Sequence, residues 1–163
     1  MAGPDKPDVA AGPPAEQAGP VPVSDAVRDR FRRQRIRDTA PELALRHELH
    51  RRGLRYRVDF QPAPGVRRRA DVVFTRARVA VFVDGCFWHS CPAHGTSPRN
   101  NGDWWRDKLA RTADRDRDTN EGLAAAGWTV VRVWEHEPPV AAADRVEAAV
   151  RSAWGGVGAG DGG

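Results

Sequence analysis

Residues 70–94 read ADVVFTRARVAVFVDGCFWHSCPAH, and this stretch decides how the chain folds. Two apolar runs, 70–74 and 79–83, flank the segment TRAR, a spacing that is typical of a β-hairpin. Because their apolarity is continuous rather than alternating, both strands are expected to be covered on both faces. The sequence therefore predicts a buried hairpin that leads into a loop rich in cysteine, histidine and aromatic residues.

Two carboxylates are expected on one face of this hairpin. With TRAR as the turn, the numbers of paired residues sum to 153, so Asp71 lies opposite Phe82. Since side chains alternate between faces, Asp84 shares that face and lies diagonally from Asp71, at about 7–8 Å. Two carboxylates at this separation can converge on Mg²⁺, which binds a few carboxylates together with waters and phosphate oxygens.

Two other interpretations of these acids stay open, and a register shift of one residue would separate them. Asp84 precedes a glycine, and Asp-Gly is also ordinary turn chemistry. Asp71 could instead form an ion pair with one of three preceding arginines, Arg67, Arg68 or Arg69.

The loop after the hairpin concentrates metal ligands. Cys86, Cys91 and His94 supply three within nine residues, and structural zinc takes four. His136 is the best candidate for the fourth, because it follows the last predicted strand at the same edge of the sheet if that strand is parallel to 79–83. His89 is nearer in sequence. Free thiols, or a disulfide closing a very short loop, are the alternatives.

Aromatic residues stand close to these ligands, at Phe87, Trp88, Trp104 and Trp105. Core packing is one role for each ring, above all for Trp105, which has helical spacing with Leu109. Insertion between base pairs of DNA is the other role, because rings on a basic, metal-bearing loop suit that task.

The remaining sequence completes a single α/β domain at 27–154, between a disordered arm (1–26) and a flexible, Gly-rich tail (155–163). TAPE at 39–42 is a capping box that predicts a helix over 39–52. Its inward residues are expected to be Leu43, Ala44 and Leu49. Further strands are predicted at 55–60 and 128–134, and further helices at 103–127 and 141–154. This order predicts a mixed sheet flanked by helices.

Charge favours a polyanionic partner. Residues 28–136 hold 23 Lys+Arg against 14 Asp+Glu, a net charge of +9, whereas the flanking segments hold 3 against 8, a net charge of −5. A basic body of this kind attracts nucleic acid. The arginine run at 28–37 is either a phosphate-contacting arm or a solvated charged face. No membrane span and no export signal are visible, so a cytoplasmic protein with reduced cysteines is expected.

Five segments together resemble the very short patch repair (Vsr-type) DNA mismatch endonucleases: RRRADVVF, VAVFVDGCFWHSCPAH, WWRDK, RDRDT and GWTVVRVWEHE. The resemblance covers roughly residues 28–140. It implies a fold related to the PD-(D/E)xK restriction nucleases, with a structural zinc. It also implies Mg²⁺-dependent nicking of duplex DNA 5′ to the thymine of a T·G mismatch, which arises when 5-methylcytosine deaminates.

The resemblance also implies roles for individual residues. Asp71 would be the carboxylate that binds catalytic Mg²⁺, with the main-chain carbonyl of Val83 as a second ligand. His89 would be the general base or acid, and Glu42 would support the site from the first helix, although its capping role also explains it. Asp84, where some relatives carry histidine, would be a metal ligand, a partner of His89 or a water-orienting group.

Three further sets of residues match the family. The zinc ligands would be Cys86, Cys91, His94 and His136, where other members use more cysteine. The rings that intercalate beside the mismatch would be Phe87, Trp88 and Trp105. The cations expected to contact DNA are Arg68, Arg69 and Lys108. Ala70 stands where many such nucleases have proline, and no lysine completes a D/ExK signature.

Three functions remain open at this stage. The first is a monomeric, nucleoid-associated mismatch nickase, whose product would pass to mismatch-repair factors and a DNA polymerase. The second keeps the nuclease fold but cuts at another mismatch or at a restriction-like site. The third is a zinc-stabilised DNA-binding module without catalytic activity.

Overall fold

The computed structural model describes residues 37–94 and 102–156. The predicted N-terminal arm, the arginine run up to residue 36 and the tail beyond residue 156 lie outside the described residues. The described elements are α2 (Ala40–Arg51), β1 (Arg57–Phe60), β2 (Ala70–Phe74), β3 (Val79–Asp84), α3 (Gly102–Ala125), β4 (Thr129–Trp134) and α4 (Pro139–Gly156). Their order confirms the predicted order, although α4 runs two residues beyond the predicted end of the domain.

The four strands form one mixed sheet in the order β1-β2-β3-β4. β2 pairs antiparallel with both β1 and β3, and β4 runs parallel to β3. Val72 lies opposite Val81, and Phe74 lies opposite Val79, so the predicted register of the hairpin is confirmed. The parallel β4 brings the C-terminal ends of β3 and β4 to one edge of the sheet, where the candidate site lies.

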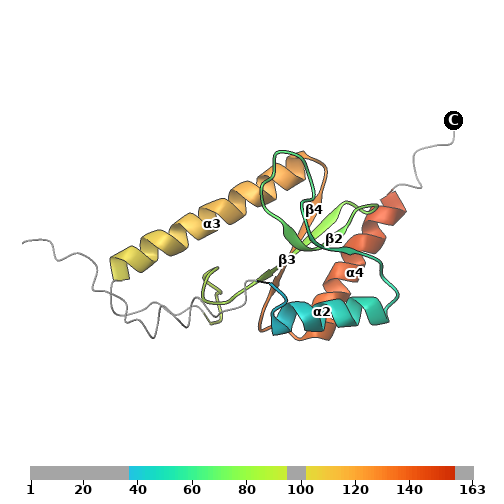
Figure 1. The fold of residues 1–163 in the computed structure, drawn as a ribbon, viewed down its shortest axis with the longest axis horizontal. Coiled ribbons are helices and arrows are strands. Elements are labelled where there is room, and N and C mark those ends of the chain that lie inside the picture. The colour runs from blue at the N-terminus through green and yellow to red at the C-terminus, as the bar shows by residue number, and fades with distance from the viewer. Residues whose placement is uncertain (1–36, 95–101, 157–163) are drawn as a thin grey trace, which may run out of the picture.

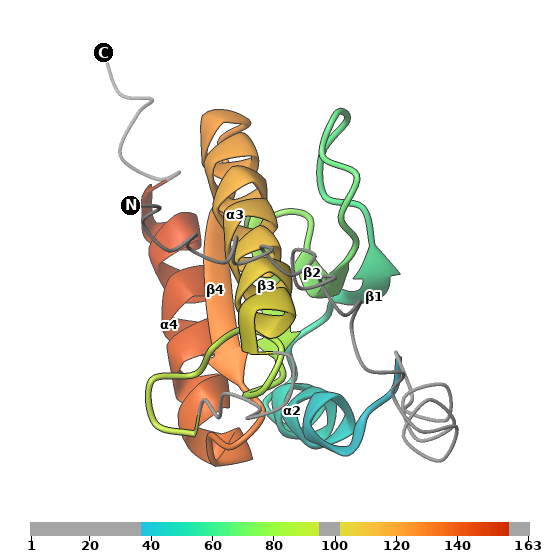
Figure 2. The same cartoon turned by 90° about the vertical axis from the view of Figure 1, so that its left-hand side faces the viewer.

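Helices cover both faces of the sheet, and each face has its own core (Figure 1). α2 and α4 pack on one face around residues such as Leu49, Val81 and Val146. The other core joins Leu123 of α3 to Ala80 and Phe82 of β3. Figure 2 shows α4 and α3 on either side of β4. Coverage on both faces explains why the two hairpin strands are continuously apolar.

The first half of α3 extends beyond the sheet, as Figure 1 shows. Its buried residues are Thr112, Asp116, Thr119 and Leu123, so the helix turns a largely polar stripe toward the protein. Only the C-terminal end of that stripe joins the apolar core. Within the described residues, every helix is too short or too polar to cross a membrane.

The prediction for α2 was partly wrong. Leu43 was expected to face inward, but its side chain is 48% exposed, and Leu45 is buried instead together with Leu49. Residues four apart lie on the same face of a helix, whereas residues two apart do not. The stripe that contacts α4 therefore runs through 45 and 49 and leaves Leu43 outside.

We predict that Leu49→Ala lowers the free energy of unfolding by about 2–5 kcal/mol, because it leaves a cavity beside a fully buried side chain. Leu43→Ala on the same helix is the matched control and is expected to change it by less than about 0.5 kcal/mol. Urea denaturation of both variants measures the difference. Equal losses would contradict the assignment of the buried face.

Candidate active site and metal cluster

Asp71 is the second residue of β2 and stands among apolar neighbours. Its Oδ2 accepts a hydrogen bond of 2.7 Å from the backbone N–H of Val83 on β3. Two of the three arginines that could have neutralised it have other partners, because Arg68 contacts Asp116 and Arg69 contacts Asp59, and Arg67 forms no ion pair with Asp71. Among the described residues, Asp71 therefore forms no ion pair.

The environment of Asp71 favours its protonated form while no metal is bound. Burial raises the pKa of Asp71 to about 6, and the charges of Glu42 and Asp84 add to the increase. The hydrogen bond from Val83 and the charge of Arg46 oppose it. Carboxylates of α2, β2 and β3 therefore interact electrostatically at this site.

Glu42 is buried and fully occupied by local contacts. Its two oxygens accept hydrogen bonds from the Thr39 hydroxyl and the Asp38 N–H, each at 2.9 Å. Arg46, one turn further along α2, forms an ion pair with it at 2.9 Å. The predicted capping box is therefore only partly realised, because the Thr39 hydroxyl bonds Glu42 and makes no hydrogen bond that caps the helix.

His89 lies in the loop after β3 and points at two acids. Its Nδ1 is 2.5 Å from Oδ2 of Asp116 on α3 and 3.7 Å from Oδ1 of Asp84. Because a carboxylate accepts the Nδ1 proton, this arrangement leaves Nε2 as the free acceptor. An imidazole held in this way can take a proton from water.

Sequence reasoning missed two members of this site, Asp116 and Arg132. Arg132 contacts both oxygens of Asp84, at 2.7 and 2.8 Å, and its Nη2 lies 3.2 Å from Asp116. A signal for Arg132 was present, because it is the one charged residue in the strand TVVRVW. Asp116 carried no comparable signal, since charged residues alternate through RDRDT.

The predicted ligands Cys86, Cys91, His94 and His136 come together, with ligand atoms all within 4.8 Å of one another. The Sγ atoms of the two cysteines lie 3.0 and 3.7 Å from Nδ1 of His136. Both cysteines are free thiols, so the disulfide alternative is wrong. Two sulfurs and two imidazoles at these separations fit a tetrahedral zinc site, whose ligands lie about 2.0–2.3 Å from the metal.

The sheet edge builds this cluster. The Glu135 N–H donates to the carbonyl of Asp84, which extends the pairing of β3 and β4 by one residue. The Glu135 carboxylate then accepts a hydrogen bond of 2.7 Å from the Cys86 N–H. Burial and the neighbouring Cys91 raise the pKa of Cys86 to about 11, so a metal that binds at neutral pH releases its proton. His89 is not part of the cluster.

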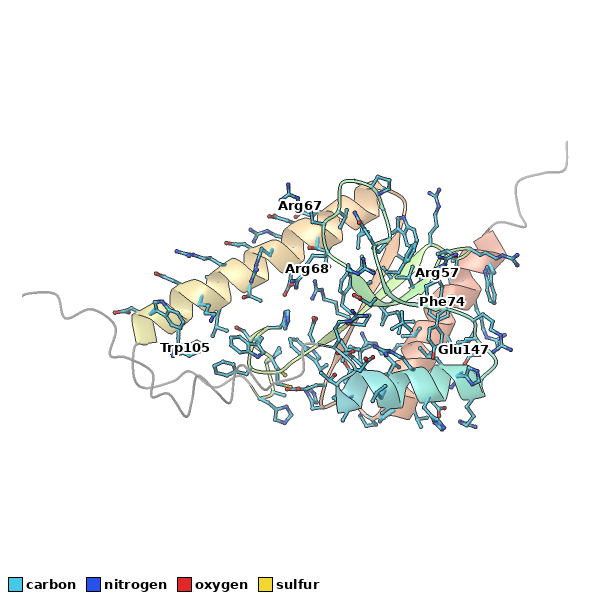
Figure 3. The ribbon with its side chains drawn as sticks, viewed as in Figure 1. Arg57, Arg67, Arg68, Phe74, Trp105 and Glu147 are labelled. Carbon is cyan, nitrogen blue, oxygen red and sulfur yellow. The ribbon has the colours of Figure 1, made fainter. Side chains whose placement is uncertain are left out.

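The aromatic residues gather between the loop and the start of α3. Ring centroids of Phe87 lie 5.1 Å from Trp88 and 5.3 Å from Trp105. The Nζ of Lys108 lies 4.8–5.3 Å from the ring centroids of Trp88, Trp104 and Trp105. Figure 3 shows Trp105 on the side of α3 that faces the loop. In the described part of the chain, these rings belong to neither hydrophobic core, and Trp104 is 45% exposed.

The three predicted DNA-contacting cations differ in their surroundings. Lys108 is exposed above the aromatic rings. The side chain of Arg68 is 43% exposed and points from the loop before β2 toward α3, as Figure 3 shows. Arg69 is 57% exposed but is held by Asp59 beside β1. All three leave donor groups at the surface, and two of them also have an acidic partner.

Comparison of the sequence with known proteins relates this chain to enzymes that cut DNA. The family model for the DNA mismatch endonuclease Vsr matches residues 25–94. Type II nicking enzyme V.NaeI of Lentzea aerocolonigenes is 48% identical over 120 residues, 72% of each chain. Type II nicking enzyme V.XorIIP of Xanthomonas oryzae pv. oryzae is 38% identical over 113 residues, 68% of this chain and 81% of that one. DNA mismatch endonuclease Vsr of Escherichia coli is 36% identical over 100 residues, 61% and 62% of the two chains.

These similarities define the class of protein as a DNA-nicking endonuclease. The chain belongs to the Vsr family, as its matched segments and its relatives show.

We predict that Asp71→Asn stabilises the protein in magnesium-free buffer at pH 8. An unfolded Asp has a pKa of about 3.9, so its pKa of about 6 in the folded protein means that stability falls as pH rises between these values. Asparagine is neutral and still accepts the Val83 N–H. The gain is expected to be about 2–3 kcal/mol at pH 8 and to shrink toward pH 4, measured by urea denaturation. A gain that does not depend on pH would contradict the buried charge.

Proposed function

We propose that this protein nicks duplex DNA on the 5′ side of the thymine of a T·G mismatch, in a Mg²⁺-dependent reaction that starts very short patch repair. Two observations carry the proposal: the partly buried carboxylate of Asp71 is held by a backbone N–H and forms no ion pair within the described residues, and the Nδ1 of His89 is held by an acid. The relative from Escherichia coli that is named a mismatch endonuclease supports the choice of substrate.

Asp71 and the main-chain carbonyl of Val83 are the proposed Mg²⁺ ligands, and the carboxylate is free to neutralise part of the cation's charge. When bound, the ion supplies Lewis-acid polarisation of the phosphodiester. His89 accepts the proton of the attacking water at Nε2, because Asp116 fixes the proton on Nδ1. Glu42 on α2 acts on the charge of Asp71 and holds Arg46 through an ion pair. The products are a 5′-phosphate and a 3′-hydroxyl.

The proposed role of the aromatic cluster is to recognise the mismatch. Phe87, Trp88 and Trp105 contact one another outside the two cores, so they can enter a base stack without opening the fold. Lys108 beside them and the arginines at 68 and 69 bind phosphates, which fixes the position of the duplex without reading its sequence. A mismatched step is easier to unstack than a paired one, and this difference favours insertion there.

The domain is proposed to be a PD-(D/E)xK-type nuclease domain over residues 27–154, with structural zinc at Cys86, Cys91, His94 and His136. The loop that carries His89 lies between two of these ligands in sequence. A metal in the cluster would therefore hold the general base in place.

We predict that Cys91→Ser removes bound zinc and lowers the midpoint of thermal unfolding, because one lost ligand opens the site. Zinc content by atomic emission and a thermal melt of the same sample measure both effects. His47→Asn, an exposed histidine on α2 outside the cluster, is the control and should retain full zinc. Full zinc content in Cys91→Ser would overturn the assignment.

The biological setting follows from the reaction. The protein acts as a monomer in the cytoplasm, associated with the nucleoid, and passes nicked DNA to mismatch-repair factors and a DNA polymerase. The segments outside the domain, residues 1–26 and 155–163, have no proposed role in the chemistry.

A second candidate is nicking at a restriction-like duplex site, which the relatives called type II nicking enzymes suggest. The relative with 48% identity carries that name, and the one named a mismatch endonuclease is 36% identical. Both candidates use the same catalytic residues, so only the substrate separates them.

We predict nicking of a labelled duplex with a single T·G pair in Mg²⁺. Asp71→Ala is expected to reduce the rate by on the order of a thousandfold or more, because the Lewis acid contributes several kcal/mol to the barrier. Asp118→Ala, an exposed acid on α3, is the control and should keep the wild-type rate. Equal cleavage of the fully paired duplex would favour the second candidate. Binding without cleavage by the wild type would contradict both.

A further inference from the structure

Arg132 connects the two acids that face His89. Its Nη1 lies 2.7 and 2.8 Å from the two oxygens of Asp84, and its Nη2 lies 3.2 Å from Oδ1 of Asp116. Its Nε donates to the side-chain carbonyl of Asn120 at 3.1 Å. The side chains of Asp84 and Asp116 are only 8% and 12% exposed, so these charges depend on Arg132 rather than on water.

We propose that Arg132 is a positioning residue of the nickase, which holds Asp116 against Nδ1 of His89 and keeps Asp84 out of the metal site. Asp84 then acts as the partner of Arg132 and not as a second metal-binding carboxylate. The inference rests on the proposed roles of Asp71 and His89. It assigns roles to Arg132 and Asp84, to which the proposed mechanism gives none.

The distribution of ion pairs supports metal binding by Asp71 and not by Asp84. Glu42 is paired with Arg46. Asp84 is paired with Arg132, and Asp116 contacts Arg132, Arg68 and His89. Among these four carboxylates, only Asp71 forms no ion pair within the described residues, and a backbone N–H holds it instead. A divalent cation would have to displace the partly buried guanidinium of Arg132 to reach Asp84, whereas Asp71 has no ion-pair partner to displace within the described residues.

The sheet register explains why Arg132 reaches both acids. Arg132 on β4 lies beside Phe82 on β3, with its guanidinium carbon 5.1 Å from the ring centroid. Asp84 is two residues further along β3 and shares the face of Phe82, so it lies diagonally ahead of Arg132. On α3, Asp116 and Asn120 are four residues apart and present their side chains from one face. Three elements therefore converge on one guanidinium.

The first experiment measures cation binding without catalysis. Ca²⁺, a hard oxygen-binding cation of the same charge, is titrated calorimetrically into the complex of the protein with T·G duplex. Asp84→Asn is expected to keep the Kd within about twofold of wild type, and Asp71→Asn to raise it by about tenfold or more. A rise for Asp84→Asn as large as that for Asp71→Asn would overturn the inference. If the Asp71→Asn variant binds Ca²⁺ with the wild-type Kd, the proposed function is contradicted. The role of Arg132 is not contradicted by that result.

The second experiment observes His89 directly and does not depend on the metal. The Nδ1 proton of His89 is followed by ¹⁵N-edited NMR and assigned by its absence in His89→Gln. In Arg132→Met it is expected to broaden or move upfield, because Asp116 is no longer held, and Arg132→Lys should restore it in part. Arg151→Met, which removes an exposed ion pair on α4, is the matched control and should leave the signal unchanged. An unchanged signal in Arg132→Met would overturn the inference.

Nicking rates complete the test. Arg132→Met and Asp84→Asn are each expected to lower kcat about tenfold or more with little change in KM. The double variant should lose much less than the product of the two losses, because it removes the pair together and leaves no isolated charge. Multiplicative losses would show independent roles and contradict the coupling.

Discussion

The hydrogen bond from the Val83 N–H to Asp71 is the contact on which the rest of the site depends. It fixes an acid at the point where β2 leaves its pairing with β3, next to the strand end that carries Asp84. A neutral amide donor holds the carboxylate in place without neutralising it. The result is a partly buried, directed charge, which is costly for the empty protein and suitable for a cation.

The C-terminal end of β3 also positions the candidate metal cluster. The site of Asp71 and the cysteine–histidine cluster therefore share one structural support. β3 ends at Asp84, and Cys86 follows two residues later. The pairing of β3 with β4 carries on to Glu135, which binds the Cys86 N–H and directly precedes His136. The loop with His89 is therefore anchored at its start by the sheet. Such anchoring suits a general base, because a small displacement of the imidazole weakens proton transfer.

The sequence alone predicted the parts of the fold that depend on periodicity and short turns. The hairpin register followed from the two apolar runs and TRAR, and the parallel placement of β4 brought His136 to the cysteines, as the structure confirms. Leu43 was assigned wrongly, because a short helix with a mixed surface has no single apolar stripe that the sequence could identify. Arg132 was missed because a charged residue in an apolar strand gains its meaning only from partners on another element.

The helix α3 shows most clearly why long-range polar contacts escape sequence reasoning. Its inward stripe is polar at Thr112, Asp116 and Thr119 and becomes apolar only at Leu123. Amphipathic analysis looks for an apolar face and finds none over most of this length. The helix nevertheless has a fixed orientation, because Leu123 packs on the sheet at one end and Trp105 packs on the loop rings at the other. Between these two anchors, Asp116 meets His89, so the stripe that looks like a solvated face is the one that orients this imidazole, the proposed general base.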